Sequence, residues 1–339
     1  MTSLFNDYVR LLRLPGLGGL ATPALFGAIS VGVMDLHILG VIFLIGCFST
    51  VYGFVLNDYL DVEVDKQTSE LYERPLVKGT ISKKTALVIC VLSLFGTYLT
   101  ILLFFYSTPI TSSKIFAVIC ITLAGILGSL YNFYSKKIVG ADFLVATSEF
   151  LMVLFGALAV TQENTINIIT WVIAFLTFNQ LLYMNAVDGG VKDADHDYKQ
   201  NVKNIASVLG VRVKENSEMI IPVGFKIFGI CIRCLSGFLV FVPFLFYGYN
   251  YELYQVLLLL ILIVLVLFFT LRLLNLKKFD RDKIKEIITS EAYLRYSLVP
   301  VMLISVIGLF GSLILIVFPF VWYVLLAPLS GEKLFKPRI

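Results

Sequence analysis

A run of polar side chains lies where an apolar segment ends near the start of the chain. The run reads "NDYLDVEVD" and covers residues 57–65, the first acidic segment. On a helix that turns by about 100° per residue, one amide and three carboxylates of this segment fall on a single face: Asn57, Asp58, Asp61 and Asp65. Glu63 points away from that face. Carboxylates this close repel one another, so the face gains from a bound cation.

A second acidic segment, "KDADHD" at residues 192–197, follows a later apolar stretch. Asp193 and Asp197 stand four residues apart and share a helical face, whereas Asp195 lies on roughly the opposite one. Both segments therefore present oxygen ligands at the end of an apolar stretch.

Oxygen-rich faces of this kind suit Mg²⁺, which keeps several waters, uses one or two carboxylates and completes its shell with substrate phosphate. Basic side chains that could neutralise the remaining phosphate charge lie nearby in the sequence: Arg74, Lys78, Lys136, Lys137, Lys192 and Lys203. The combination predicts a diphosphate site with its metal ions. The alternative for any single acid is a solvated loop residue, but a solvated loop does not require two acidic segments with matching spacing.

The elements that must position these residues are membrane spans. The 339 residues are 58% hydrophobic and only 15% charged, far more apolar than soluble domains. Charges fall in short segments between apolar runs of about 20 residues, the length of a helix that crosses about 30 Å of hydrocarbon. We predict an all-α polytopic membrane protein with a single transmembrane domain over residues 1–339. The nine expected spans are 16–34, 37–57, 84–106, 114–131, 141–160, 166–187, 218–247, 254–275 and 298–328.

The distribution of Lys and Arg indicates which ends of the spans face the cytoplasm, because cytoplasmic loops carry an excess of these residues. They concentrate at the N-terminus and after the second, fourth, sixth and eighth spans. This predicts a multi-pass protein of the cell membrane, with a cytoplasmic N-terminus and two cytoplasmic cap loops at about 57–84 and 188–217. Nine spans would leave the basic C-terminus, residues 333–338, on the outer side, in disagreement with the pattern.

These motifs resemble those of the UbiA superfamily of intramembrane prenyltransferases. The first acidic segment is similar to the family's NDxxDxxxD motif, and "RPLVKG" at 74–79 resembles the RPxxxG segment that follows it. The second acidic segment resembles the family's DxxxD motif through Asp193 and Asp197. The likeness in motif order and span placement covers residues 10 to 325.

The resemblance implies a ring of nine helices around a central cavity that is capped by the two cytoplasmic loops. It also implies an enzyme that transfers a prenyl group from an isoprenyl diphosphate to a lipophilic acceptor, with Mg²⁺ held between the acidic segments. We expect membrane lipid as a further partner and no nucleic acid. The implied ligands of metal and diphosphate are Asn57, Asp61, Asp65, Asp193 and Asp197, with Arg74, Lys78 and Lys203 as diphosphate contacts.

The segment after the fourth span is similar to a Tyr- and Lys-containing stretch of the family but lacks its prolines. It reads "LYNFYSKKIVG" and offers two tyrosines and two lysines, of which we expect Tyr131 and either lysine at the diphosphate. Tyr134 competes with Tyr131, and Lys136 with Lys137. In the seventh span, Lys226 and Arg233 share a face, and either contact substrate, extend to the interface or pair with acids.

Three other functions fit parts of the pattern. An ion-coupled transporter also has many spans and buried acids, but carriers place charged sites near the bilayer midplane, whereas these acids collect at one face. A membrane CDP-alcohol phosphotransferase would need a D-x-x-D-G-x-x-A-R pattern that the chain lacks. A prenyl diphosphate cyclase of the same fold would use the same acids. For a transferase, the sequence does not distinguish an aromatic quinone precursor from a glycerol phosphate lipid, a tetrapyrrole or a sugar phosphate.

Overall fold

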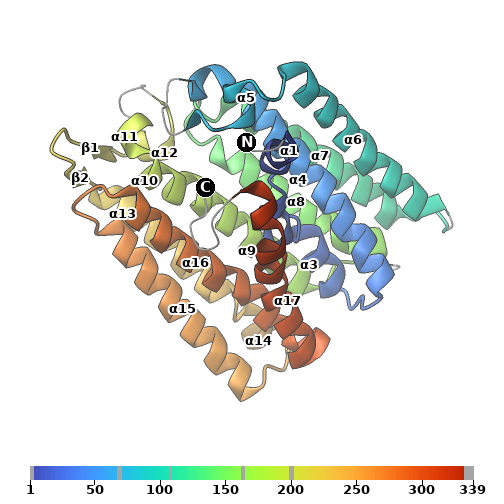
Figure 1. The fold of residues 1–339 in the computed structure, drawn as a ribbon. Helices are drawn as coiled ribbons and strands as arrows, with labels where there is room; N and C mark the ends of the chain where they lie inside the picture. Colours follow the sequence, from blue (N-terminus) through green and yellow to red (C-terminus); the bar gives the residue numbers. More distant parts are fainter. Residues whose placement is uncertain (1–3, 67–70, 107, 162–164, 198–201, 332–339) are drawn as a thin grey trace.

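Helices make up most of the protein (Figure 1), as predicted for an all-α membrane protein. The computed structural model describes residues 4–66, 71–106, 108–161, 165–197 and 202–331. The long helices are α4 (Leu36–Asp65), α6 (Lys83–Tyr106), α7 (Ser112–Tyr134), α8 (Asp142–Val160), α9 (Ile168–Tyr183), α13 (Val223–Leu239), α15 (Leu253–Leu274), α16 (Arg281–Met302) and α17 (Ile304–Leu326).

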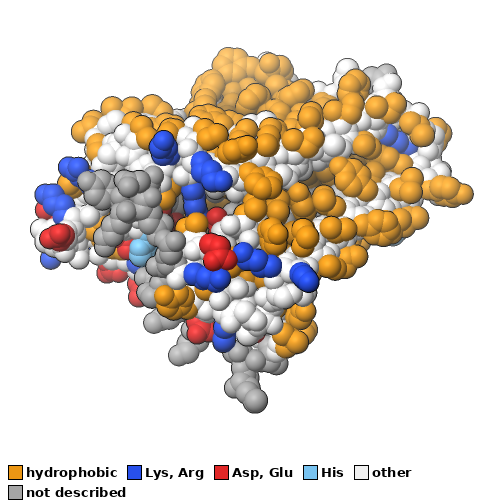
Figure 2. Space-filling view, turned by 90° about the horizontal axis from the view of Figure 1, so that it is seen from above, with side chains coloured by type: hydrophobic (Ala, Val, Ile, Leu, Met, Phe, Trp, Pro, Cys, Tyr) orange, Lys and Arg blue, Asp and Glu red, His pale blue; other side chains and the backbone are white. Residues whose placement is uncertain are grey.

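The surface of the bundle is that of a membrane protein. Large apolar side chains are exposed along the outer faces of the helices, with Leu102 and Leu103 of α6 64% exposed and Phe310 of α17 78% exposed. Viewed from the end that carries the acidic segments, hydrophobic side chains cover most of the periphery, and charged ones gather over part of the face (Figure 2). Within the described residues, seven helices are long and apolar enough to cross a membrane, or eight if a bent pair counts as one span. The count of nine is not confirmed.

The first expected span is broken rather than continuous. It consists of η1 (Leu14–Gly16), α2 (Leu17–Leu20) and α3 (Pro23–Ser30), and this stretch bends by 42° from α1 (Leu4–Leu11). Pro23 begins α3 because proline lacks the N–H that a helix interior requires. Gly27 and Gly156 let α3 and α8 approach so closely that a Cβ at either position would collide with the other helix's backbone.

Helix α16 corrects the predicted topology, because the sequence analysis treated most of its residues as a cytoplasmic loop. Its first residue lies at the end of the bundle that carries the acidic segments, where Arg281 contacts Asp195. Its last turn lies at the opposite end, where the Gln255 side chain donates to the Val301 and Met302 carbonyls. Helix α16 is therefore an additional passage through the bundle, and α17 returns.

The C-terminal part of the described chain consequently lies beside the N-terminus, not at the opposite end as expected. Arg10 Nε donates to the Ser330 carbonyl in η4 (Ala327–Ser330) at 2.6 Å, and Trp322 Nε1 donates to the Leu14 carbonyl at 2.8 Å. The basic residues 333–338 lie outside the described residues, but the chain enters them from this end.

Short elements cover the end of the bundle where the acidic segments lie (Figure 1). The expected cap loop 57–84 begins as the last turns of α4 and continues through α5 (Pro75–Lys78). The expected cap loop 188–217 contains the end of η3 (Met184–Gly189), then α10 (Gly190–Lys192), α11 (Ala194–Asp197), α12 (Ile205–Val208) and β1 (Arg212–Val213), which pairs antiparallel with β2 (Met219–Ile220). The hairpin register places Arg212 opposite Ile220.

Each acidic segment stands on a hydrophobic cluster of its own. Val55, Leu56 and Val62 of α4 pack with residues of α1, α5 and α6 beneath the first segment. Val191 and Ala194 pack with residues of α9, α13, α15 and α16 beneath the second. The buried side chains of these two clusters therefore fix the backbone at both segments. The carboxylates of the acidic segments lie above the clusters, at one end of the bundle.

Candidate active site

Two arginines hold the buried carboxylates of the first acidic segment. Arg74 Nη1 lies 2.6 Å from Asp65 Oδ2 and 3.4 Å from Asp58 Oδ1, and Arg13 Nη2 lies 2.9 Å from the same Asp58 oxygen. Burial alone would lower the pKa of Arg74, but Asp58 and Asp65 raise the pKa above its usual value, so this side chain stays charged. Asp58 is thus a structural partner of both arginines. Glu63 is exposed and pairs with Lys66 and Lys83, in agreement with its predicted direction.

Lys136 lies between the two acidic segments. Its Nζ is 2.9 Å from Asp61 Oδ2 in the first segment, and its charge also reaches Asp65 and, in the second segment, Asp197. The Lys136 carbonyl accepts a hydrogen bond from the Lys203 main-chain N–H at 3.2 Å. The Lys136 ammonium is therefore ion-paired with the first segment and close enough to the second for its charge to act on Asp197, in a position where a cation is electrostatically favoured.

Asparagine and tyrosine side chains line the inner side of this region. Tyr131 donates to Asn185 Oδ1 at 3.0 Å, and its hydroxyl lies near enough to Asp61 and Asp193 to interact with them electrostatically. Asn57 Nδ2 lies 3.4 Å from Asn132 Oδ1. By contrast, the side chains of Tyr134 and Lys137 are exposed. The structure therefore brings Tyr131 and Lys136, rather than Tyr134 and Lys137, to the acidic segments.

The second acidic segment supplies the other two carboxylates of the candidate site, Asp193 and Asp197. Asp197 Oδ2 accepts a 2.6 Å hydrogen bond from Asn204 Nδ2. Burial, together with the charge of Asp193, raises the pKa of Asp197 to about 6, because both disfavour its ionised form. Asp193 is more open, with 43% of its side chain exposed, and Lys192 Nζ lies 3.8 Å from its Oδ2. Asp193 is therefore the more accessible of the two carboxylates to a ligand that approaches from solvent, and Asp197 is partly buried.

Among the described residues, the side chains of two predicted diphosphate contacts, Lys78 and Lys203, make no ion pair with the two acidic segments. Lys78 Nζ lies 3.5 Å from Glu73, and its side chain is 37% exposed. Lys203 approaches the site through its main chain, and its side chain is exposed. Both residues stay near the rim of the site, where they would meet only a ligand that extends outward.

Four charged residues pair deep between α9, α13, α15 and α16, and the sequence analysis identified only one of them, Arg233. Arg233 Nη2 lies 2.7 Å from Glu291 Oε1, and Arg295 Nη2 lies 3.3 Å from Asp188 Oδ2, with every side chain no more than 3% exposed. Lys226 Nζ instead donates to Asn275 Oδ1 at 2.7 Å. Of the alternatives for these two residues, pairing with an acid holds for Arg233, whereas Lys226 contacts an asparagine and no acid among the interactions of the described residues.

The donor set at the acidic segments fits Mg²⁺. Across the described parts of the chain, no three Asp, Glu, His or Cys side chains lie close enough together to form a complete metal cage. Mg²⁺ does not need one, because water and phosphate oxygens usually complete its shell around one or two carboxylates. The Asp61 carboxylate already holds a cation, the Lys136 ammonium, and Asp197 of the other segment is close enough to interact electrostatically with both Lys136 and Asp193.

A family model, described as the UbiA prenyltransferase family, matches residues 20–290. The chain belongs to the UbiA family. The matched range contains both acidic segments, Lys136 and the first part of α16, residues 281–290. The family assignment confirms the predicted resemblance and the prediction that the chain is a prenyltransferase, and it decides against the transporter and the CDP-alcohol phosphotransferase.

Curated relatives of this UbiA-family chain act on two kinds of acceptor, judged by their names. A digeranylgeranylglyceryl phosphate synthase of Saccharolobus solfataricus is 28% identical over 253 residues, which is 70% of this chain and 84% of the relative. A 4-hydroxybenzoate octaprenyltransferase of Vibrio cholerae is 30% identical over 182 residues, 53% of this chain and 59% of the relative.

Solved structures share the fold. A digeranylgeranylglyceryl phosphate synthase superposes with a TM-score of 0.64 at 17% identity, covering 90% of this chain and 99% of the other. A UbiA homologue from Archaeoglobus fulgidus bound to GPP and Mg²⁺ superposes with a TM-score of 0.61 at 19% identity, covering 88% and 99%. These matches confirm the predicted fold class, an all-helical UbiA-type bundle.

Proposed function

We propose that this protein transfers a prenyl group from an isoprenyl diphosphate to a lipophilic acceptor in the presence of Mg²⁺ and releases diphosphate. The observation that carries the proposal is the position of Lys136, which is ion-paired with Asp61 of the first acidic segment and acts electrostatically on Asp197 of the second, at one end of an apolar bundle. A diphosphate head needs cations and water, while its prenyl tail needs an apolar environment. This end of the bundle offers both.

The carboxylates act as metal ligands in this proposal, and not as general acids or bases. Asp61, Asp65, Asp193 and Asp197, with the Asn57 amide, would hold the metal, which when bound neutralises charge on the departing diphosphate. Lys136 adds a fixed positive charge at the same place and stabilises the leaving group electrostatically. Tyr131, hydrogen-bonded to Asn185, presents its hydroxyl and ring at the inner wall.

The apolar bundle below the site excludes water from the reacting carbon. A prenyl cation is captured by water unless water is kept away, so the allylic carbon must lie below the charged end, among the helices. We also propose that the charged end faces the cytoplasm. The concentration of Lys and Arg in the segments at this end supports that orientation.

The acceptor belongs to one of the two classes that the relatives' names indicate, a glycerol phosphate ether lipid or an aromatic quinone precursor. The glycerol phosphate lipid is the first candidate, because the relative named for it aligns over more of this chain. The other possibility for a protein of this fold, cyclisation of the diphosphate, would give a product without acceptor.

The test is transfer by the purified protein with Mg²⁺, labelled diphosphates of several chain lengths and acceptors of both classes. We expect a product whose mass equals acceptor plus prenyl group, and loss of that product in Asp61→Asn and Asp193→Asn. Glu63→Gln serves as the matched control, because Glu63 lies on the same helix and faces away. Products that contain no acceptor, or full activity in Asp61→Asn, would contradict the proposal.

A further inference from the structure

Helix α16 contacts the second acidic segment and the residues just before it. Near its start, Arg281 Nη2 lies 2.6 Å from Asp195 Oδ1, inside the segment. Four turns further along, Arg295 Nη2 lies 3.3 Å from Asp188 Oδ2, five residues before Asp193. Between these two ion pairs, the side chains of Ile284 and Ile287 are fully buried in the hydrophobic cluster that includes Val191 and Ala194. A single helix thus contacts the chain at two points, at Asp188 before the proposed metal ligands and at Asp195 between Asp193 and Asp197.

The backbone that Arg295 holds is irregular. Regular helix α9 ends at Tyr183, and Met184–Gly189 form a π-helical segment, η3. A π-turn is rare and less stable than an α-turn, and it rotates every later side chain relative to the helix before it. The directions of Asp193 and Asp197 therefore depend on η3 keeping this conformation. Asp188 is the acidic residue of η3, and it forms an ion pair with Arg295.

The charges around η3 balance one another. Arg233 pairs with Glu291, which also accepts a 3.0 Å hydrogen bond from Thr270, and the Arg233 guanidinium stacks 3.3 Å above the Tyr183 ring. Two arginines and two carboxylates leave no net charge. Breaking one partner of such a buried pair is strongly destabilising because it leaves an uncompensated charge.

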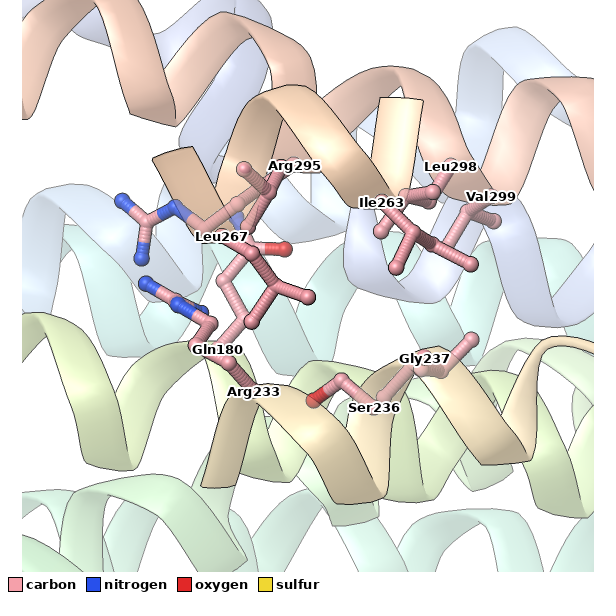
Figure 3. Close-up of a pocket in the computed structure, with 11 residues that line it drawn as sticks. Gln180, Arg233, Ser236, Gly237, Ile263, Leu267, Arg295, Leu298 and Val299 are labelled. Atoms are coloured by element: carbon pink, nitrogen blue, oxygen red, sulfur yellow. The ribbon is translucent and has the colours of Figure 1, made fainter. Parts of the chain in front are cut away.

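A small cavity of about 20 Å³ adjoins this cluster, with Arg233 and Arg295 pointing side by side at one end and Ile263, Leu298 and Val299 at the other (Figure 3). Among the described residues, Arg295 Nε and Nη1 find no hydrogen-bond acceptor and Asp188 Oδ1 finds no donor. Both hydrogen-bond donors and acceptors therefore remain unsatisfied beside the cavity, and the two arginines balance the two carboxylates in charge. The volume is about that of one water molecule. A water fits this cavity, and an anionic acceptor group does not.

We propose that α16 is the positioning helix of the second acidic segment, with Arg295 fixing η3 through Asp188 and Arg281 fixing Asp195, so that Asp193 and Asp197 meet the metal and diphosphate. The positioning role of α16 rests on the proposed function. Arg281 and Arg295 are positioning residues, since they act through the acidic segment. Outer partners of metal ligands typically change metal affinity or activity by about 10–100-fold when they are replaced.

The test uses Arg295→Met in the purified full-length protein, with Mn²⁺ and inorganic pyrophosphate as probes. We expect Mn²⁺ affinity, followed by electron paramagnetic resonance, to fall by about 10–100-fold, with faster amide hydrogen exchange across residues 184–197. The double variant Asp188→Asn with Arg295→Met leaves no unpaired buried charge, but it still lacks the ion pair that fixes η3, so its Mn²⁺ affinity should stay low even where its stability recovers; wild-type affinity in the double variant would contradict the positioning role. In transfer assays, the KM for the diphosphate and the Mg²⁺ requirement should rise more than kcat falls.

The matched control is Gln255→Leu, which removes the hydrogen bonds at the opposite end of α16. We expect it to lower thermal stability while Mn²⁺ affinity stays at the wild-type value. If Arg295→Met does not fold, Arg281→Gln carries the test, because Arg281 lies at the accessible end of the helix and its ion pair is with the segment itself.

Wild-type Mn²⁺ affinity in both Arg295→Met and Arg281→Gln would overturn the inference, and so would an equal loss in Gln255→Leu. These results are separable from failure of the proposed function. If the wild-type protein transfers no prenyl group to any acceptor, the proposed function fails, whereas the comparison of Mn²⁺ binding and hydrogen exchange among the variants still decides the role of α16.

Discussion

Lys136 and Lys137 are adjacent in the chain but differ in surroundings, so they form a natural test of the site. Lys136 Nζ lies 2.9 Å from Asp61 Oδ2, whereas the Lys137 side chain is exposed. If Lys136 stabilises the diphosphate as it leaves, Lys136→Met should lower kcat/KM, and Lys137→Met should leave it unchanged. Both substitutions remove one charge and keep a long apolar side chain, so they differ mainly in position.

The size of the effect follows from the geometry. A hydrogen bond to a charged group contributes about 1.5–3 kcal/mol. The Lys136 side chain is 35% exposed, so solvent screening places the effect in the lower part of that range, about 1.5–2 kcal/mol, or about 10–30-fold in kcat/KM. Steady-state kinetics with varied diphosphate at saturating Mg²⁺ and acceptor measure this ratio directly.

The dependence on Mg²⁺ gives a second readout. Lys136 competes with a metal ion for the Asp61 carboxylate, so Lys136→Met should leave the Mg²⁺ requirement unchanged or lower it, while the KM for the diphosphate rises. A loss of activity in Lys137→Met as large as that in Lys136→Met would show that overall charge, not position, matters. Unchanged kcat/KM in Lys136→Met would refute the assigned role.

Three further outcomes are expected. Removal of divalent cations with EDTA should abolish transfer and Mg²⁺ should restore it, because the carboxylates supply negative charge that only a cation offsets; activity that survives EDTA would contradict the metal site. Asp61→Asn should lower kcat/KM by at least about 100-fold, the upper end of what outer partners of metal ligands contribute, while Glu63→Gln leaves it unchanged, as measured in the same kinetic assay. Gly27→Ala should lower the unfolding free energy by about 1–3 kcal/mol through overpacking against Val153, whereas Gly40→Ala, with open space around it, should not, as compared by thermal denaturation in detergent.

The sequence predicted the helical fold and the direction of the first acidic segment because both depend on local periodicity. Apolar runs of span length and a 100° turn per residue suffice to place Asp61 and Asp65 together and Glu63 apart. Periodicity does not tell a metal ligand from a structural carboxylate. Asp58 shares the same face, yet its partners are Arg13, 45 residues earlier in the chain, and Arg74.

The choice between Tyr131 and Tyr134, and between Lys136 and Lys137, required the structure for a similar reason. Helix α7 ends at Tyr134, so the lysines lie beyond the regular helix, where a turn of 100° per residue no longer predicts direction. The π-helical segment Met184–Gly189 was equally hidden, because no pattern of side chains distinguishes it from the α-helix that precedes it.

Helix α16 explains why the span count and the charge pattern disagreed in the sequence analysis. A hydropathy window scores Glu291 and Arg295 as polar residues of a loop, but each is neutralised by a partner from another helix: Arg233 for Glu291 and Asp188 for Arg295. Once these pairs form, the helix can be buried in the bundle. The disagreement over the C-terminal residues therefore arose from the missing passage and does not count against the charge pattern. With α16 included, Arg10 meets Ser330 at the end of the bundle that carries the acidic segments, so the chain enters its basic C-terminal residues on the same side as every other basic segment.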